Sequence, residues 1–135
     1  MRASFNYEYL GKGKFGQLSR PVAKVSFLSK EGKWIEFSMV VDTGADFSIL
    51  PRYIARILKI SLETDCVEDE TIGIGGEQKI YFLKQKIKVK IGNMEREVPI
   101  AFFANNDVPP LLGRLGFLEI FETTFVKNKK LVFKE

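Results

Sequence analysis

The segment VVDTGADFSILP, residues 40–51, places two carboxylates where they contribute nothing to packing. Val40 and Val41 are typical of a buried strand, yet Asp42 follows them directly. A threonine and a glycine come next, and Asp46 lies four residues after Asp42. Because a carboxylate is costly to bury, an acid between an apolar strand and a tight turn is a candidate for chemistry.

The residues that the sequence lacks restrict what this chemistry is. The chain contains no histidine and a single cysteine, Cys66. A Ser–His–Asp or Cys–His nucleophile system therefore cannot form, and neither can an HExxH zinc site or a thiolate metal site. We expect no metal and no cofactor. If the chain hydrolyses a substrate without a metal, carboxylates must carry the proton transfers.

Length and composition are those of a soluble globular protein with one core. The chain has 135 residues, of which 45% are hydrophobic and 28% charged. No apolar run reaches about 18 residues, so no transmembrane helix is expected. The N-terminal segment lacks the apolar stretch of a signal peptide, and one cysteine cannot form an internal disulfide. A cytoplasmic protein without membrane contact is the prediction.

The net charge of +4 comes largely from lysines. Lysines at 86, 88 and 90 alternate with apolar residues at 87, 89 and 91, which predicts a strand with one solvated face. Such lysines also discourage pairing at a sheet edge. A nucleic-acid surface is the alternative, but aromatic or arginine residues are not interleaved with these lysines. We therefore expect no nucleic-acid partner.

Strands are the elements that must position Asp42. We divide the chain into an N-terminal arm, residues 1–20, and one domain, residues 21–135. The arm is predicted as irregular, and its GKGKFG as a flexible arm or hairpin rather than a dinucleotide site, because no strand precedes it.

Within the domain, alternating residues predict strands over 21–29 and 34–41. A helix is expected from Pro51, with Ile54, Ile57 and Leu58 on one face. Strands over 86–91 and 96–104, one or two helical turns near 115–121 and a final hairpin over 123–133 complete a mostly β, closed or sandwich-like antiparallel fold with one or two short helices.

Three motifs in order resemble those of the retropepsin-like aspartic proteases. They are VVDTGADFSIL, the glycine-rich IGIGG and LLGR with a short helix after it. The resemblance covers roughly residues 21–133, and the motifs are most similar to those of uncharacterised prokaryotic single-domain members. It implies the acid protease fold, a closed β-barrel or sandwich with one lobe per chain, and the activity of an aspartic-type endopeptidase.

The number of DTG motifs implies a homodimer. Peptide hydrolysis by carboxylates needs two of them facing one water, one ionised and the other protonated. Two carboxyls about 3 Å apart cannot both ionise, so the pair shares one proton. Since this chain has one DTG, the second aspartate must come from a second copy, with two Asp42 residues at a two-fold axis. The partners expected are therefore a second copy and an extended peptide or protein substrate.

The resemblance implies a role for each residue of the motif. Asp42 is the catalytic acid, Thr43 bonds across the two-fold axis and Gly44 allows the tight turn. Ala45 is small where the substrate backbone runs, and Asp46 bonds the substrate main chain.

The same resemblance implies that Asp46 pairs with Arg114 of the Gly113–Arg114 motif, partly buried and bidentate. Two readings without this pair stay open. Asp46 caps a helix that starts near Ser48, or Arg114 is a solvated arginine on a helix.

The segment 71–82, TIGIGGEQKIYF, is predicted as a hairpin, and the resemblance implies that it is the flap over the substrate. Its tip would comprise Gly73, Ile74, Gly75 and Gly76, with the Ile74 amide as donor to a water that holds two substrate carbonyls. An ordinary hairpin turn is the alternative. The walls of apolar subsites are implied to be Val40, Phe47, Ile72, Ile74, Pro109 and Leu111.

Departures from the retroviral pattern concern the ends of the chain. Leu115 stands where the retroviral members have an asparagine, and the C-terminal hairpin is longer than their terminal strand. This hairpin is expected to stay in its own subunit, which leaves part of the dimer interface to the N-terminal arm. Arg20 would then reach Asp46 of the partner chain.

Two function classes remain besides the protease. One is a catalytically weak or inactive retropepsin-like module for dimerisation or peptide binding, in which DTG serves the interface. The other, a basic RNA-binding β protein, rests on net charge alone.

Overall fold

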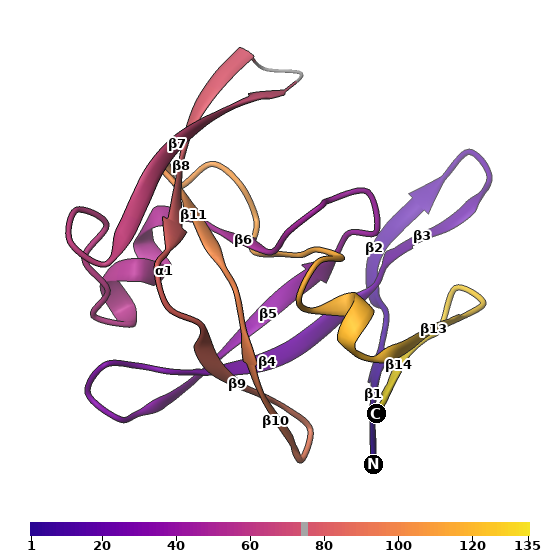
Figure 1. Ribbon diagram of the computed structural model, residues 1–135. Helices are drawn as coiled ribbons and strands as arrows, with labels where there is room; N and C mark the ends of the chain where they lie inside the picture. Colours follow the sequence, from indigo (N-terminus) through magenta and orange to yellow (C-terminus); the bar gives the residue numbers. More distant parts are fainter. Residues whose placement is uncertain (74–75) are drawn as a thin grey trace.

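The computed structural model describes the backbone of residues 1–73 and 76–135 and the side chains of residues 1–70 and 78–135. Figure 1 shows a curled sheet from which two hairpins project, β7–β8 on one side and β2–β3 on the other. The predicted mostly β fold with one or two short helices is confirmed. No helix in the described part of the chain is long and apolar enough to cross a membrane.

The main sheet is a mixed, nine-stranded one with the order β10-β9-β4-β5-β12-β6-β11-β8-β7. Its strands are β4 (Val22–Leu28), β5 (Trp34–Val41), β6 (Ile49–Leu50), β7 (Cys66–Gly73), β8 (Gly76–Leu83), β9 (Ile87–Ile91), β10 (Met94–Val98), β11 (Ala101–Phe103) and β12 (Leu111–Leu112). The pairs β5–β12 and β6–β11 are parallel, whereas the sequence indicated an antiparallel fold. Strands of two or three residues give no periodic signal, so their pairing was not predictable.

The remaining elements lie at the ends of the chain and between the strands. They are β1 (Arg2–Asn6), β2 (Glu8–Gly13), β3 (Gly16–Arg20), α1 (Arg52–Ile57), the 3-10 helix η1 (Leu118–Ile120), β13 (Glu122–Val126) and β14 (Lys130–Lys134). A three-stranded sheet has the order β1-β14-β13, and β2 pairs with β3. The final hairpin and the single helical turn before it are therefore as predicted.

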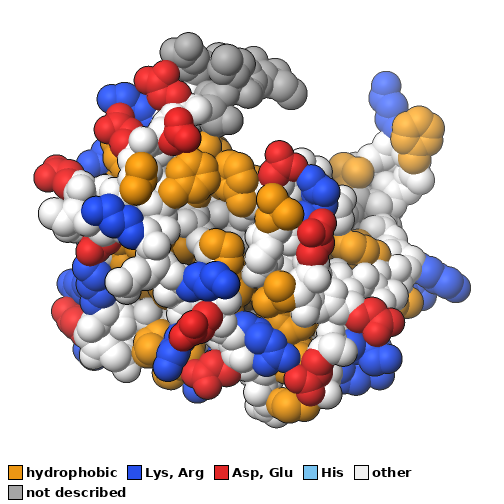
Figure 2. All heavy atoms as spheres, viewed as in Figure 1, with side chains coloured by type: hydrophobic (Ala, Val, Ile, Leu, Met, Phe, Trp, Pro, Cys, Tyr) orange, Lys and Arg blue, Asp and Glu red, His pale blue; other side chains and the backbone are white. Residues whose placement is uncertain are grey.

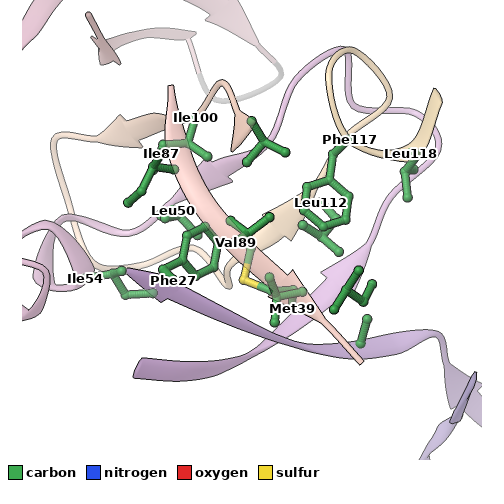
Figure 3. Close-up of a cluster of buried hydrophobic side chains, with 14 of the residues drawn as sticks. Phe27, Met39, Leu50, Ile54, Ile87, Val89, Ile100, Leu112, Phe117 and Leu118 are labelled. Carbon is green, nitrogen blue, oxygen red and sulfur yellow. The ribbon is translucent and has the colours of Figure 1, made fainter. Parts of the chain in front are cut away.

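The main core is closed by side chains from strands far apart in the sequence. Phe27 of β4, Met39 of β5 and Val89 of β9 are fully buried, and Figure 3 shows them together with residues of β6, β12 and α1. Phe117 and Phe133 pack edge to face with ring centroids 6.4 Å apart. Because Phe133 belongs to β14, this contact attaches the three-stranded sheet to the body.

Helix α1 corrects one predicted buried residue. Ile54 and Leu58 are fully buried as expected, but Ile57 is exposed, and Ala55 is buried in its place. The helix spans only Arg52–Ile57, so its buried side is defined over only about one and a half turns. In so short a helix, the buried side differs from the predicted stripe at one position.

The lysine strand corrects a second prediction. In β9 the apolar residues Ile87, Val89 and Ile91 are buried, so the predicted alternation is confirmed. However, β9 lies between β10 and β4 rather than at an edge. Protection of an edge is therefore not the role of these lysines. Lys90 instead lies over the Trp34 ring, with its Nζ 4.2 Å from the ring centroid.

The first 20 residues are more regular than predicted. β1 pairs with β14 along its whole length, from Arg2 with Lys134 to Asn6 with Lys130. Its partner is more than 120 residues away in the sequence, so no local pattern indicated the strand. GKGKFG lies at the end of the β2–β3 hairpin, which confirms the hairpin interpretation. The boundary between an arm and a domain at residue 20 stays a prediction.

One loop after α1 carries an acid whose ionisation stabilises the fold. Asp65 accepts hydrogen bonds from the Lys30 ammonium and, at 2.7 Å, from the Ser61 amide. These bonds hold the pKa of Asp65 below its ordinary value of about 3.8, and the bond from Lys30 has the largest effect. A depressed folded-state pKa means that the unfolded chain binds the proton more readily. The resulting stability is present above pH 4 or so and is lost as the pH falls through the folded-state value.

We expect Asp65→Asn to lower the melting temperature at pH 7. The difference from the wild type should shrink as the pH falls below about 4, because both side chains are then uncharged. Thermal unfolding, followed by circular dichroism from pH 7 to below pH 4, measures this difference in melting temperature. An equal deficit at every pH would mean that the charge of Asp65 is not what stabilises the loop.

Candidate functional site

Asp42 directly follows β5, whose end is held by backbone bonds to two neighbouring segments. The Val40 amide donates to the Pro110 carbonyl at 2.8 Å and the Val41 amide to that of Pro21 at 3.0 Å. The Asp42 amide donates to the Leu112 carbonyl at 2.9 Å. Since β12 is inserted between β5 and β6, the loop 42–48 joins two strands that are both paired with the same third strand.

The carboxylate of Asp42 is oriented by its own loop. Its Oδ1 accepts a hydrogen bond from the Gly44 amide at 2.9 Å, and its carbonyl accepts one from the Ala45 amide at 3.1 Å. A side chain at Gly44 would place Cβ 3.2 Å from this Oδ1. Glycine is therefore the residue that leaves the carboxylate undisturbed. Among the described residues no ion pair involves Asp42, and its side chain is half-buried.

The predicted pair of Asp46 and Arg114 is present, with Nη2 2.5 Å from Oδ1. Its predicted burial and bidentate geometry are wrong. The two side chains are 66% and 42% exposed, and Arg114 Nη1 is directed to Glu119 Oε1 at 3.7 Å. Glu119 lies on η1 and shares the guanidinium, which the motif alone did not reveal. The reading of Asp46 as a helix cap is also wrong, because the helix begins at Arg52.

Backbone bonds attach the Asp42 loop to the LLGR segment more firmly than this ion pair does. The Arg114 amide donates to the Ala45 carbonyl at 3.0 Å, and the Leu115 amide donates to that of Asp46 at 2.8 Å. An exposed ion pair contributes about 0–1 kcal/mol, whereas the backbone bonds fix the register of two segments almost 70 residues apart.

Ser48 is a structural residue of this site that the sequence reading missed. It is fully buried, and its Oγ accepts the Gly113 amide at 3.0 Å. A Cβ at Gly113 would lie 2.3 Å from the Phe47 carbonyl oxygen, so the two segments touch through a glycine. The signal available was a lone serine inside the apolar run FSIL, which marks a buried hydroxyl in need of a partner.

A small apolar cluster covers the sheet face opposite the main core. Along β8 and β11, alternate residues face the two sides, as strand geometry requires. Phe47 and Phe82 have ring centroids 5.2 Å apart. The cluster consists of buried Ile49, Ile80 and Ala101 with partly buried Phe47, Phe82 and Phe103. Figure 2 shows hydrophobic side chains on this face, below the β7–β8 hairpin.

This apolar floor was predicted only through Phe47. Phe82 and Phe103 were missed as pocket residues, although alternation of aromatic residues along two neighbouring strands was visible in YFL and AFF. The predicted wall residues Val40 and Leu111 are half-buried and paired with each other in register, and Pro109 is exposed.

The predicted flap is an antiparallel hairpin longer than expected. β7 and β8 pair from Cys66 with Leu83 to Gly73 with Gly76. The predicted tip residues Ile74 and Gly75 lie outside the described residues, as does the side chain of Ile72. Their assigned roles therefore stay predictions.

Two of the cavities in the described part of the chain have volumes of about 330 and about 440 Å³, and neither is lined by a residue of loop 42–48. Over the same residues, no group of three or more potential metal ligands occurs. Arg20 is paired with Glu8 at 3.0 Å within its own chain, so its predicted contact with the partner's Asp46 stays a prediction.

Comparisons with known proteins agree on one family. A family model described as "gag-polyprotein putative aspartyl protease" matches residues 29–119, which include both Asp42 and Arg114. The crystal structure of a retropepsin-like aspartic protease from Rickettsia conorii superposes with a TM-score of 0.63 at 21% identity, covering 93% of this chain and 97% of that one. A search of curated proteins finds no match. At this identity the structural likeness establishes the fold, and it confirms the predicted retropepsin-like architecture.

Proposed function

Because the chain belongs to the gag-type aspartyl protease family and has the retropepsin-like fold, we propose that it is an aspartic endopeptidase that works as a homodimer. One observation carries the proposal. Asp42 follows a strand that lies between β4 and β12, its amide donates to the Leu112 carbonyl and its Oδ1 accepts the Gly44 amide, yet it is half-buried and forms no ion pair among the described residues. A rigidly positioned acid of this kind is half of a two-carboxylate site.

The second half would be Asp42 of another copy related by two-fold symmetry. One carboxylate takes a proton from a water bound between the pair, and that water attacks the carbonyl carbon of the scissile peptide. The other, protonated carboxyl donates a hydrogen bond to the carbonyl oxygen. The first carboxyl then passes the proton that it took from the water to the leaving nitrogen as the C–N bond breaks. Gly44 keeps each carboxyl in the orientation that this exchange requires, and Thr43 links the two loops across the axis.

The substrate would be an extended peptide lying over the apolar floor. Phe47, Phe82 and Phe103 offer aromatic surface for its side chains, while Ala45 and Asp46 offer backbone and carboxylate groups to its main chain. Leu111 and Pro109 extend the walls of these subsites.

In this proposal the β7–β8 hairpin is the flap. Gly73 and Gly76 at the ends of its strands permit opening and closure, and Ile72, Ile74 and Gly75 provide the contacts over the peptide. The single, buried Cys66 suits a reducing compartment such as the cytoplasm.

An inhibitor titration tests the proposal. A peptide isostere with a hydroxyl in place of the scissile carbonyl should block cleavage of a mixed peptide library at mildly acidic pH, with about one molecule bound per two chains. The same isostere without its hydroxyl is the matched control and should bind more weakly. Binding of peptides without turnover from acid to neutral pH would instead support a peptide-binding module.

A further inference from the structure

The β2–β3 hairpin, residues 8–20, stands away from the body of the molecule (Figures 1 and 2). Two hydrogen bonds attach it, one just before its base and one near its turn. The Tyr7 amide donates to the Lys129 carbonyl at 2.8 Å, and Asn128 Nδ2 donates to the Gln17 carbonyl at 3.4 Å. An ion pair between Glu8 and Arg20 closes the base. The rest of the hairpin makes no contribution to the core.

The hairpin nevertheless carries large apolar side chains. Tyr9, Leu10 and Leu18 are each more than half exposed, and Phe15 at the turn is fully exposed. Single exposed hydrophobic residues are ordinary, but four on a projecting hairpin of 13 residues are typical of a docking surface. None of the four belongs to the core of the chain, so a partner that covers them would bury apolar area that folding leaves exposed.

The position of the hairpin indicates which partner. β3 leads through Arg20 into Pro21, whose carbonyl accepts the Val41 amide next to Asp42. The base of the hairpin is therefore next to the half-site. A surface beside a site that needs a second copy of the chain is placed to contact that copy.

The charges of the hairpin specify the contact. Lys12 and Lys14 near its turn are exposed and form no ion pair among the described residues. On the outer strand β7, Asp69 and Glu70 are likewise exposed and form no ion pair in that set, although Glu70 lies opposite Lys79, which binds Glu68 at 3.2 Å. Figure 1 places β7 and the hairpin on opposite sides of the Asp42 loop, so their charges attract each other between chains rather than within one.

We propose that the β2–β3 hairpin is a dimerisation arm, which docks its basic, apolar end on the acidic β7 strand of a second copy of this chain. Two-fold symmetry makes the contact twice, each arm holding the partner's β7. The inference rests on the proposed homodimer and adds the surface that forms it. It also places each arm against the proposed flap of the partner, at the end of the substrate groove.

Charge reversal tests the contact. Sedimentation of K12E/K14E and of D69K/E70K should give a dimer dissociation constant raised about tenfold or more at low salt. The chain with all four changes should return to within about threefold of the wild type, because the attraction is restored with opposite signs. The proposal would be overturned if the dissociation constant of the double variants were unchanged. It would also be overturned if the chain with all four changes formed a weaker dimer than either double variant.

Two controls separate this result from unfolding and from the activity. K33E/R56E changes two exposed cations, one in the β4–β5 turn and one on α1, and should leave the dimer unaffected. F15S should weaken the dimer without altering thermal unfolding of the dilute chain. Sedimentation measures dimerisation whether or not the chain cleaves peptides. If the dimer is unaffected by the charge-reversing substitutions, the proposed arm contact is refuted while the peptidase proposal stands. If the dimer depends on the arm but cleaves no peptide, the peptidase proposal is refuted and the arm contact is supported.

Discussion

Replacing Asp42 with asparagine should abolish peptide cleavage while leaving the fold and the dimer intact. Asparagine has the same shape, and its oxygen can still accept the Gly44 amide that Oδ1 accepts now. It cannot take a proton from water. We expect the rate to fall about 1,000-fold or more, since a positioned acid or base contributes about 100- to 10,000-fold and this residue serves in both halves of the site.

The matched control for this variant is Glu36→Gln. Glu36 is an exposed carboxylate on the same strand, β5, and its loss should leave the rate unchanged. Cleavage of one peptide by both variants at mildly acidic pH measures the contrast. Cleavage by Asp42→Asn at the wild-type rate would refute the assignment of Asp42.

The second large effect concerns Gly113, where a methyl group has no room. Its Cβ would lie 2.3 Å from the Phe47 carbonyl oxygen and 2.4 Å from the carbonyl carbon, both backbone atoms that no rotamer change can move. Separation of the two segments would also break the bond from the Gly113 amide to Ser48 Oγ. We expect Gly113→Ala to lower the free energy of unfolding by roughly 3 kcal/mol or more.

Gly32→Ala is the matched control for this steric effect. Gly32 has a φ of +79°, and a Cβ there would meet no atom within 4 Å. The substitution therefore costs only the backbone strain of about 1 kcal/mol. Urea unfolding of both variants measures the difference. Equal stabilities would mean that the close approach of Gly113 to Phe47 is not a constraint on the fold.

The sequence predicted what depends on short segments. The alternation around β9 predicted buried Val89, and the DTG run predicted that a strand ends at Asp42. The pairing of Asp46 with Arg114 was also foreseen, because both belong to motifs of the family. The first two features depend on fewer than a dozen consecutive residues, whereas the ion pair, whose partners are 68 residues apart, was foreseen only through the family resemblance.

Contacts between distant segments that belong to no family motif were not predictable. The insertion of β12 between β5 and β6 depends on a two-residue strand, and the pairing of β1 with β14 joins the ends of the chain. The role of Ser48 follows only once Gly113 lies beside it. The competition of Glu119 for Arg114 likewise depends on where η1 lies. In each case the partner, rather than the local pattern, determines the structure.

The central claim is that one active site needs Asp42 from two chains. Its most direct test mixes wild-type and Asp42→Asn chains at constant total concentration and allows the subunits to exchange. If only dimers with two intact aspartates cleave, an equal mixture retains roughly a quarter of the wild-type rate. Retention of about half, as expected if each chain worked alone, would contradict the account.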